Sequence, residues 1–474
     1  MPAPAPATAP SVLERRLGPL DAAAVIVSNV IGGGILFTSP AVAALVPNAW
    51  LFLSVWAAGG ALAFMGAMAY AELAALRPRA GGEYVYLGAA YGPLAAFLTG
   101  WTSFVAGFSG AIAASSVFLA VYLNRFIPGA GDTTPLFTIP LPWVPLVFSR
   151  QSLVAVATIV LMSWIHLRGV GPGRVMGNIL ATLKVLALLS FIALGLSVGA
   201  GSTANLQIAG GGSVSATSWL LALIPVMFAY SGWNAASYIA EEIRDPGRNV
   251  PRALALGTAA VIAVYVLLNL LYLFVFPVDQ LAKIEGSVLD VIADRLLNQM
   301  AGNVMGVVSI ISLAASISAN VFAGPRVYFA MARDGFFLPA AAHVHPRFRT
   351  PAVAIVAQAV WSSLLVLSGS GTALTEYTGF AVILFAGVAV AALFVLRLRE
   401  PDAPRPFRAI GYPVAPAIFT IVSALIVLNA LWNDLVRPVR FGGEWGPAAA
   451  GLLVIALGIP IYFLLRARQG GARK

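Results

Sequence analysis

The sequence predicts an all-α protein that crosses a membrane twelve times. Its 474 residues are 60% hydrophobic and only 10% charged, whereas about a quarter of the residues in a soluble domain are charged. Apolar runs long enough to span the hydrocarbon of a bilayer recur along the whole chain. The basic residues are distributed unevenly between alternate loops. Together these observations predict the number of spans and their direction.

The apolar runs give twelve spans. They cover approximately residues 19–46, 51–76, 93–127, 151–167, 175–200, 216–240, 251–276, 302–332, 351–369, 374–396, 411–433 and 446–466. With twelve spans, the termini and the even-numbered loops hold 21 of the 28 Lys and Arg residues, and the opposite side holds six. Because basic loops are retained on the inner side, both termini are expected in the cytoplasm. The remaining basic residue, Lys184, lies inside a span.

Two spans contain breaks at equivalent places in the two halves of the chain. The first break interrupts SNVIGGGILFTSP (residues 28–40), and the second interrupts FAYSGWNAASYIAEE (residues 228–242). Unwound backbone at membrane depth is tolerated only where it is buried in protein or lines a polar cavity. Paired breaks of this kind are typical of transporters built from inverted repeats.

The repeats divide the chain into six parts. These are a disordered N-terminus (1–16), a first repeat of helices 1–5 (17–200), an external linker (201–215), a second repeat of helices 6–10 (216–396), helices 11 and 12 (397–466) and a cytoplasmic tail (467–474). An odd number of helices per repeat turns the second repeat upside down relative to the first. The amphipathic outer loop at residues 277–303 is expected to form short helices across the outer face.

The direction of the chain gives the helix 1 break a polarity. Helix 1 runs outward, so its first half ends with free carbonyls at Val30 and Ile31. Its second half begins, after Gly32, with free amides at Gly33 and Gly34. A packing face or a kink is the alternative interpretation of these glycines, and the second break disfavours it.

The helix 6 break faces the other way and supplies further acceptors. Helix 6 runs inward, so its first half ends with carbonyls between Phe228 and Ser231. Amides at one break and carbonyls at both fit a zwitterion, whose carboxylate is held by the amides and whose ammonium is held by the carbonyls. Asn234, just past the break, places an amide side chain within reach of a ligand or of the unwound turn.

Lys184 is expected near the centre of the bilayer. It lies about ten residues, or about 15 Å, from the cytoplasmic start of helix 5, too deep for its ammonium to reach the interface. The side chain is therefore expected to face the protein interior. Three roles fit it: a fixed cation that binds the carbonyls of the helix 1 break in place of sodium, a proton carrier, and a tie between helices.

Other polar residues suggest weaker roles. Glu72, near the inner end of helix 2, is expected to pair with a loop arginine. Glu241, Glu242, Arg244 and Arg248 are expected to form an inner charge network that acts as a gate.

Several classes of chemistry have no support in the sequence. The chain has no cysteine, so a disulfide-linked subunit is excluded, and its three histidines are too scattered for a metal centre. No dinucleotide, P-loop or nucleophile-elbow spacing occurs, so neither a cofactor nor an enzyme activity is expected. The net charge of +10 suits lipid headgroups rather than nucleic acid.

Four motifs carry a resemblance to a known family. IGGGILFTSP (31–40) resembles helix 1 of the amino acid–polyamine–organocation superfamily, and the long stretch at residues 228–253 resembles helix 6 of its L-type amino acid transporter branch and bacterial relatives. GRVMGNILATLK (173–184) is similar to helix 5 of that branch, and residues 319–339 are similar to the end of helix 8. The motifs occur in order, and the resemblance spans about residues 15–466.

The resemblance implies a LeuT-like core of ten helices and sodium-independent amino acid transport by alternating access. Residues 30–34 would hold the α-amino and α-carboxyl groups, Phe228 would be a gate aromatic, and Lys184 would occupy the place of a sodium ion. Ser231 stands where a glycine is common. Arginine/agmatine exchangers carry a glutamate at the position of Asn234, so its absence here favours neutral substrates.

The sequence therefore predicts an inner-membrane carrier of neutral L-amino acids that is a monomer or a weak homodimer. A permease for cationic amino acids or polyamines is the alternative within transporters, and a receptor or channel is the alternative outside them. Exchange and proton symport both fit Lys184.

Overall fold

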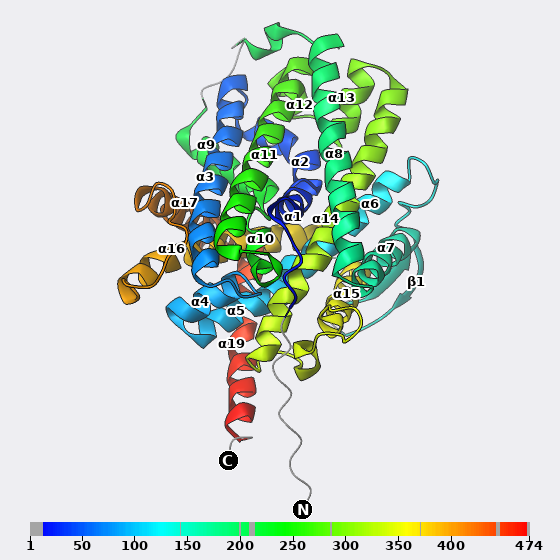
Figure 1. The fold of residues 1–474 in the computed structure, drawn as a ribbon. Helices are drawn as coiled ribbons and strands as arrows, with labels where there is room; N and C mark the ends of the chain where they lie inside the picture. Colours follow the sequence, from blue (N-terminus) through cyan, green and yellow to red (C-terminus); the bar gives the residue numbers. More distant parts are fainter. Residues whose placement is uncertain are drawn as a thin grey trace, which may run out of the picture.

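The computed structural model describes residues 13–142, 144–198, 201–207, 214–284, 287–369, 371–441 and 446–471 (Figure 1). Residues 1–12 of the predicted N-terminus, 208–213 of the predicted linker and 472–474 of the predicted tail lie outside these ranges.

The described chain is almost entirely helical. Its α-helices are α1 (Pro19–Val30), α2 (Gly33–Leu45), α3 (Ala49–Leu76), α4 (Glu83–Tyr91), α5 (Pro93–Thr102), α6 (Phe108–Leu123), α7 (Arg150–Leu167), α8 (Val170–Val198), α9 (Ala216–Tyr230), α10 (Ala235–Tyr238), α11 (Pro246–Val275), α12 (Val278–Leu281), α13 (Val288–Leu296), α14 (Gln299–Arg333), α15 (Ala352–Leu367), α16 (Gly371–Arg399), α17 (Val414–Leu431), α18 (Arg437–Phe441) and α19 (Pro447–Gly471). The 3-10 helices are η2 (Thr203–Leu206), η3 (Ala240–Glu242) and η4 (Pro339–Ala342), and the π-helices are η1 (Ser103–Gly107) and η5 (Trp432–Val436).

Most of these helices are suited to a membrane. Within the described ranges, nine spans are long and apolar enough to cross a bilayer, and the bent pair α1–α2 makes a tenth. Two shorter apolar helices, α9 and α15, accompany them. The all-helical, multi-pass architecture predicted from the apolar runs is therefore confirmed.

Both predicted helix breaks are present. Helix α1 ends at Val30 and α2 begins at Gly33, with a bend of 47° between their axes. Helix α9 ends at Tyr230, a turn follows over residues 231–234, and the short α10 continues the chain. In Figure 1, α1 and α2 lie deep in the molecule, and α1 packs against α8, α11 and α14.

The two breaks face each other at close range. A Cβ atom on Gly34 would lie 2.7 Å from the Cα atom of Ala229 in α9, so only glycine allows this approach. Gly232 has a φ of +99°, and a Cβ atom there would lie 2.3 Å from Oδ1 of Asn29 in α1. Gly34 therefore lets α2 approach the backbone of α9, and Gly232 lets the turn after α9 approach the Asn29 side chain of α1.

Three elements were not indicated by the apolar runs. Helix α4 precedes the third span, and strands β1 (Pro135–Ile139) and β2 (Leu146–Ser149) form an antiparallel hairpin before α7. Helix α17 continues through η5 into α18, which places Arg437 and Arg440 on a helix rather than in a loop. As expected, the segment at residues 277–303 contains the short helices α12 and α13.

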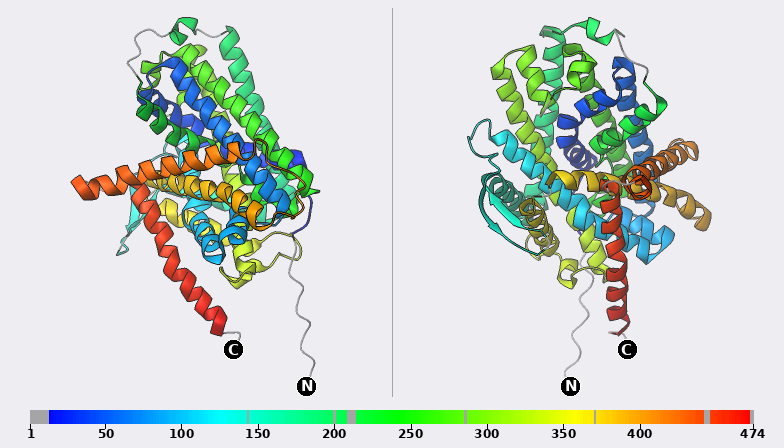
Figure 2. Two further views of the ribbon diagram at one scale, coloured as in Figure 1. Left: turned by 90° about the vertical axis from the view of Figure 1, so that its left-hand side faces the viewer. Right: turned by 180° about the vertical axis from the view of Figure 1, so that it is seen from behind.

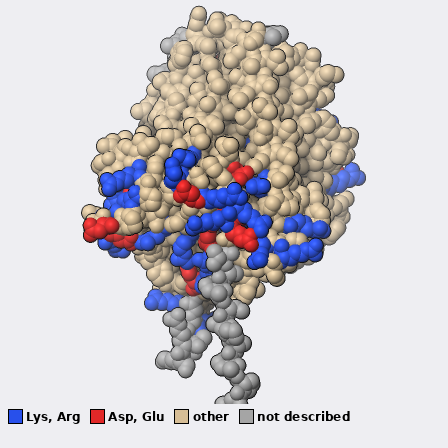
Figure 3. Space-filling model, in the orientation of Figure 1, with Lys and Arg blue, Asp and Glu red and all other residues tan. Residues whose placement is uncertain are grey.

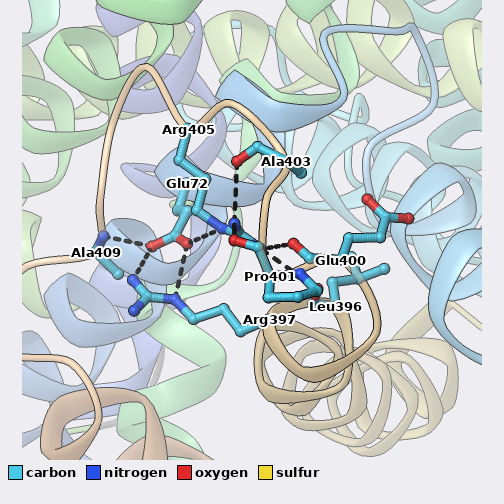
Figure 4. Close-up of polar contacts among 8 residues, drawn as sticks. All are labelled: Glu72, Leu396, Arg397, Glu400, Pro401, Ala403, Arg405 and Ala409. Carbon is cyan, nitrogen blue, oxygen red and sulfur yellow. Dashed lines mark hydrogen bonds and ion pairs between the residues drawn. The ribbon is translucent and has the colours of Figure 1, made fainter.

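Helices α17 and α19 project from the bundle, as Figure 2 shows from the side and from behind. The segment that connects α16 to α17 contains a charge cluster around the buried Glu72, at the end of α3. Figure 4 shows its carboxylate between Arg397 and Arg405, with N–O distances of 2.6 Å and 3.2 Å. The backbone amide of Ala409 donates a third hydrogen bond of 2.6 Å. The predicted pairing of Glu72 with a loop arginine is thus confirmed.

The charges predicted to form one network have different partners from those expected. Glu242 pairs with Arg326 of α14 at 2.7 Å, and both side chains are buried. Glu241 pairs with Arg333 at 3.0 Å. No ion pair among the described residues includes Arg244 or Arg248. The prediction that these two arginines pair with Glu241 and Glu242 was therefore wrong.

Candidate substrate cavity

A cavity of about 430 Å³ lies where the two breaks meet. Its size is that of a small-molecule site. Seven of the residues predicted to bind substrate line it: Val30, Gly32, Gly33, Gly34, Phe228, Ser231 and Asn234. The structure therefore brings residues about 200 positions apart around one space.

The first turn of α2 provides amide donors at this cavity. Gly32 is the N-cap and Gly33 the first helical residue, so the leading N–H groups have no partner within the helix. Gly33 and Gly34 both line the cavity. A helix N-terminus with free amides and a positive dipole end suits a carboxylate.

The last two carbonyls of α1 and its C-cap, those of Val30 and Ile31, have different hydrogen-bond partners. The Ile31 carbonyl accepts hydrogen bonds from Lys184 Nζ at 2.5 Å and from the Ser312 hydroxyl at 3.1 Å, and Ile31 does not line the cavity. Val30 lines the cavity, and its carbonyl lies 2.8 Å from the Tyr265 hydroxyl. Of these two carbonyls, only that of Val30 belongs to a residue that lines the cavity.

Lys184 lies in the middle of α8 and is fully buried. Its ammonium donates to the carbonyls of Ser28 and Ile31, at 3.1 Å and 2.5 Å. Both acceptors lie at the carbonyl end of α1, where the helix dipole is negative. The sequence placed Lys184 in the protein interior, and the structure confirms that position and adds the identity of its acceptors.

Tyr265 of α11 links the two breaks and was not foreseen. Its hydroxyl lies 2.8 Å from the Val30 carbonyl and 3.0 Å from the Ala229 carbonyl. One hydroxyl therefore contacts the carbonyl ends of both α1 and α9. The sequence signal that could have indicated it was a tyrosine in the middle of an apolar helix.

Glu83, at the start of α4, is a second unforeseen residue of the cavity wall. Its buried carboxylate accepts hydrogen bonds from Tyr70 at 2.6 Å and Asn234 at 2.7 Å, and a longer one from Thr99 at 3.4 Å. Burial raises the pKa of Glu83, and these hydrogen bonds oppose the shift. No lysine or arginine among the described residues forms an ion pair with it. The sequence signal for Glu83 was its position directly after Gly81 and Gly82 and before an apolar stretch.

Aromatic rings form part of the cavity wall. Phe37 of α2 stacks on Phe118 of α6 with ring centroids 4.7 Å apart, and both rings line the cavity. Phe228 and Phe385 contribute further apolar surface. The site thus combines backbone polar groups with an apolar wall, as ligand sites generally do.

The segment before α1 closes over the end of the second break. The amides of Arg16 and Leu17 donate to the Glu242 carbonyl at 2.9 Å and 3.0 Å, and Leu17 pairs with Ile243 as a parallel bridge. The buried pair of Glu242 and Arg326 adds a contact to α14. Backbone pairing and an ion pair therefore hold three segments together at this end.

A cavity between two broken helices of an apolar multi-pass bundle defines the class of the protein as a membrane transporter. The family model for amino acid permeases matches residues 17–457, so the chain belongs to the amino acid permease family. The protein is accordingly a transporter and not an enzyme.

Three curated relatives illustrate the similarity. The chain is 29% identical to the large neutral amino acids transporter small subunit 2 of Mus musculus, over 95% of this chain and 81% of the relative. It is 29% identical to the b(0,+)-type amino acid transporter 1 of Homo sapiens (95% and 88% covered). It is 28% identical to the Asc-type amino acid transporter 1 of Mus musculus (95% and 81% covered).

Proposed function

We propose that this permease carries neutral L-amino acids across the cell membrane by alternating access, without sodium. The observation that carries the proposal is the ammonium of Lys184 on the carbonyls of Ser28 and Ile31. In this arrangement a fixed cation neutralises the carbonyl end of α1. A coupling sodium ion is then not required to hold the break in place.

The backbone of the two breaks binds the groups that all α-amino acids share. The substrate carboxylate accepts from the amides of Gly33 and Gly34, and its ammonium donates to the carbonyls of Val30 and Ser231. The carbonyl of Phe228 accepts from the Ser231 amide at 3.0 Å, so Phe228 acts chiefly through its ring, as a gate. One of the relatives is named as a transporter of large neutral amino acids, which supports this substrate class.

A carrier of cationic amino acids or polyamines is the second candidate. One observation favours it, the buried carboxylate of Glu83 in the cavity wall. Exchange and proton symport both remain compatible with Lys184, as a fixed cation in the first case and as a proton carrier in the second.

The proposed topology has twelve spans, two inverted repeats of five helices, and both termini in the cytoplasm. Lys and Arg side chains gather over the lower part of the face drawn in Figure 3, whereas its upper part is almost free of charge, which supports one basic side. One relative is named as the small subunit of a large neutral amino acids transporter. Because this chain has no cysteine, we expect it to work as a monomer or weak homodimer without a disulfide-linked subunit.

Uptake by proteoliposomes tests the substrate class. Labelled neutral, cationic and anionic amino acids and a polyamine are supplied singly, with the pH gradient and internal amino acid varied separately. The proposal expects uptake of neutral amino acids above all others. Uptake of the polyamine with no uptake of any amino acid would contradict it.

A further inference from the structure

A hydrogen-bond network fixes the side chain of Asn234 at the cavity wall. Its Nδ2 atom donates to Oε1 of Glu83 at 2.7 Å and to the hydroxyl of Tyr238 at 3.0 Å. The Tyr70 hydroxyl donates to the same Oε1 atom at 2.6 Å. Asn234 is 5% exposed and lines the cavity.

Both N–H groups of the Asn234 amide are therefore used. The remaining polar atom of the side chain is Oδ1, which only accepts hydrogen bonds. No residue that the structure describes donates to Oδ1, and this atom is not among the buried side-chain atoms without a partner. It therefore faces the cavity as a free acceptor.

Glu83 determines this orientation in either protonation state. Its Oε1 atom receives both short hydrogen bonds, so a proton on the carboxyl group belongs on Oε2, beside Thr99 at 3.4 Å. The ionisable groups that face Glu83 are Tyr70, Tyr86 and Tyr238, which are neutral at physiological pH. Oε1 therefore accepts from Asn234 whether or not Glu83 is charged.

We infer that Glu83 is a positioning residue that locks the amide of Asn234, so that the cavity presents an acceptor to the substrate side chain. The inference rests on the proposed function and narrows it to a preference for neutral amino acids whose side chains carry a hydrogen-bond donor. A substrate with an apolar side chain of equal size excludes water from Oδ1 and gives it no hydrogen bond, which costs binding free energy. The carboxylate itself is occupied by three neutral donors, from Tyr70, Asn234 and Thr99, and so does not act as the receptor for a substrate cation.

Threonine and valine provide the test, because they have nearly the same shape and differ by a hydroxyl in place of a methyl group. In proteoliposomes, the unmodified protein is expected to show a KM for threonine about tenfold below that for valine, with similar maximal rates. Asn234→Leu removes the acceptor and should bring the two KM values together.

Variants of Glu83 separate positioning from charge. Glu83→Met removes the acceptor for Asn234, so that the amide is no longer held in one orientation, and should reduce the preference for threonine. Glu83→Gln keeps an oxygen at Oε1 without the charge and should retain it. Tyr238→Phe removes one of the two acceptors of the amide and should reduce the preference to about threefold; this second variant serves if Glu83→Met fails to reach the membrane.

The outcomes distinguish this inference from the proposed function. If the unmodified protein transports no amino acid, the proposed function fails and the inference falls with it. If threonine and valine are both transported with equal KM values, or if Glu83→Met keeps the preference, the inference alone is overturned. Equal loss in Glu83→Gln and Glu83→Met would assign Glu83 a role through its charge and would also overturn it.

Discussion

Lys184 is the residue on which the transport proposal depends most. Two charge-assisted hydrogen bonds join it to the end of α1, and each such bond is stronger than a neutral one. Lys184→Ala removes the cation from a site that contains only carbonyl acceptors. Initial uptake in proteoliposomes is expected to fall at least about tenfold, a loss of about 1.4 kcal/mol or more.

Lys283 provides the matched control, because it is an exposed lysine in the segment between α12 and α13. Lys283→Ala is expected to transport at nearly the unmodified rate. Equal folding of both variants is checked by size-exclusion chromatography in detergent. Unchanged uptake in Lys184→Ala would leave that lysine with a packing role only.

At the residue scale, the sequence predicted the backbone part of the site better than its side chains. The glycines and the direction of the chain were enough to predict where amides and carbonyls would be free. Binding of the helix 1 carbonyls was one of three roles predicted for Lys184, and its hydrogen bond to the Ile31 carbonyl agrees with that role. The sequence could not show that Ser312 shares this carbonyl, because Ser312 comes from another helix. Glu83 was missed because it is distant from Asn234 in sequence, and only the packing of α4 against the second break brings the two side chains together.

At the scale of elements, the close contact of α2 with α9 gives a sharp prediction. A Cβ atom on Gly34 would meet the backbone of Ala229 at 2.7 Å, and backbone cannot move aside as a flexible side chain can. Gly34→Ala is therefore expected to destabilise the protein by about 1–3 kcal/mol and to weaken substrate binding. Thermal unfolding in detergent and the KM for uptake measure the two effects.

Gly177 in α8 is the matched control for that substitution. A Cβ atom there would meet nothing within 4 Å, so Gly177→Ala is expected to leave stability unchanged or to raise it slightly, because alanine favours helix. If Gly34→Ala is as harmless as Gly177→Ala, the close approach of the two broken helices is not required.

Helix α13 gives a pH-dependent prediction. Burial, together with Asp294, raises the pKa of Asp290 to about 6, although Arg125 opposes the shift. A carboxyl group whose pKa is raised on folding stabilises the folded state below its ordinary pKa, and this contribution is lost as the pH rises through about 6. The melting temperature of the unmodified protein, relative to Asp290→Asn, should therefore fall between pH 5 and pH 7.

Asp279, which is exposed on α12, is the control for this measurement. The difference in melting temperature between the unmodified protein and Asp279→Asn should stay flat over the same range. A flat difference for Asp290→Asn as well would show that burial of Asp290 does not couple α13 to proton binding.

The elements themselves were partly accessible from sequence. Apolar length and the glycine breaks predicted the long helices and their interruptions, because both are local properties of the chain. The hairpin of β1 and β2, the short α4 and the π-helical η1 gave no such signal. Their conformations depend on contacts with other parts of the bundle, such as the hydrogen bond from Tyr328 to the Ser103 carbonyl in η1.

At the scale of the whole molecule, the uneven distribution of basic residues predicts which end faces the cytoplasm. The chain has no cysteine, so single cysteines can report the side on which a position lies. Ser202, near η2, and Ala340, in η4, are both exposed. In intact cells, a membrane-impermeant maleimide is expected to label Ser202→Cys and to label Ala340→Cys only after permeabilisation. The reverse pattern would invert the topology.

The end of the molecule that holds Glu242 also depends on residues far apart in sequence. Periodicity and composition identified charges near this end, but the pairing of Glu242 with Arg326 joins positions 84 residues apart. Sequence neighbours such as Arg244 were the wrong partners because the turn after α10 directs the acidic side chains toward α14. The charges could thus be predicted, whereas the partners required the fold.

The central claim is that Lys184 replaces a coupling sodium ion, and the sodium dependence of uptake tests it most directly. Proteoliposomes that contain the unmodified protein are supplied with a labelled neutral amino acid in sodium buffer and in choline buffer of equal ionic strength. Sodium independence predicts equal initial rates in the two buffers. Uptake that occurs only with sodium would contradict the account.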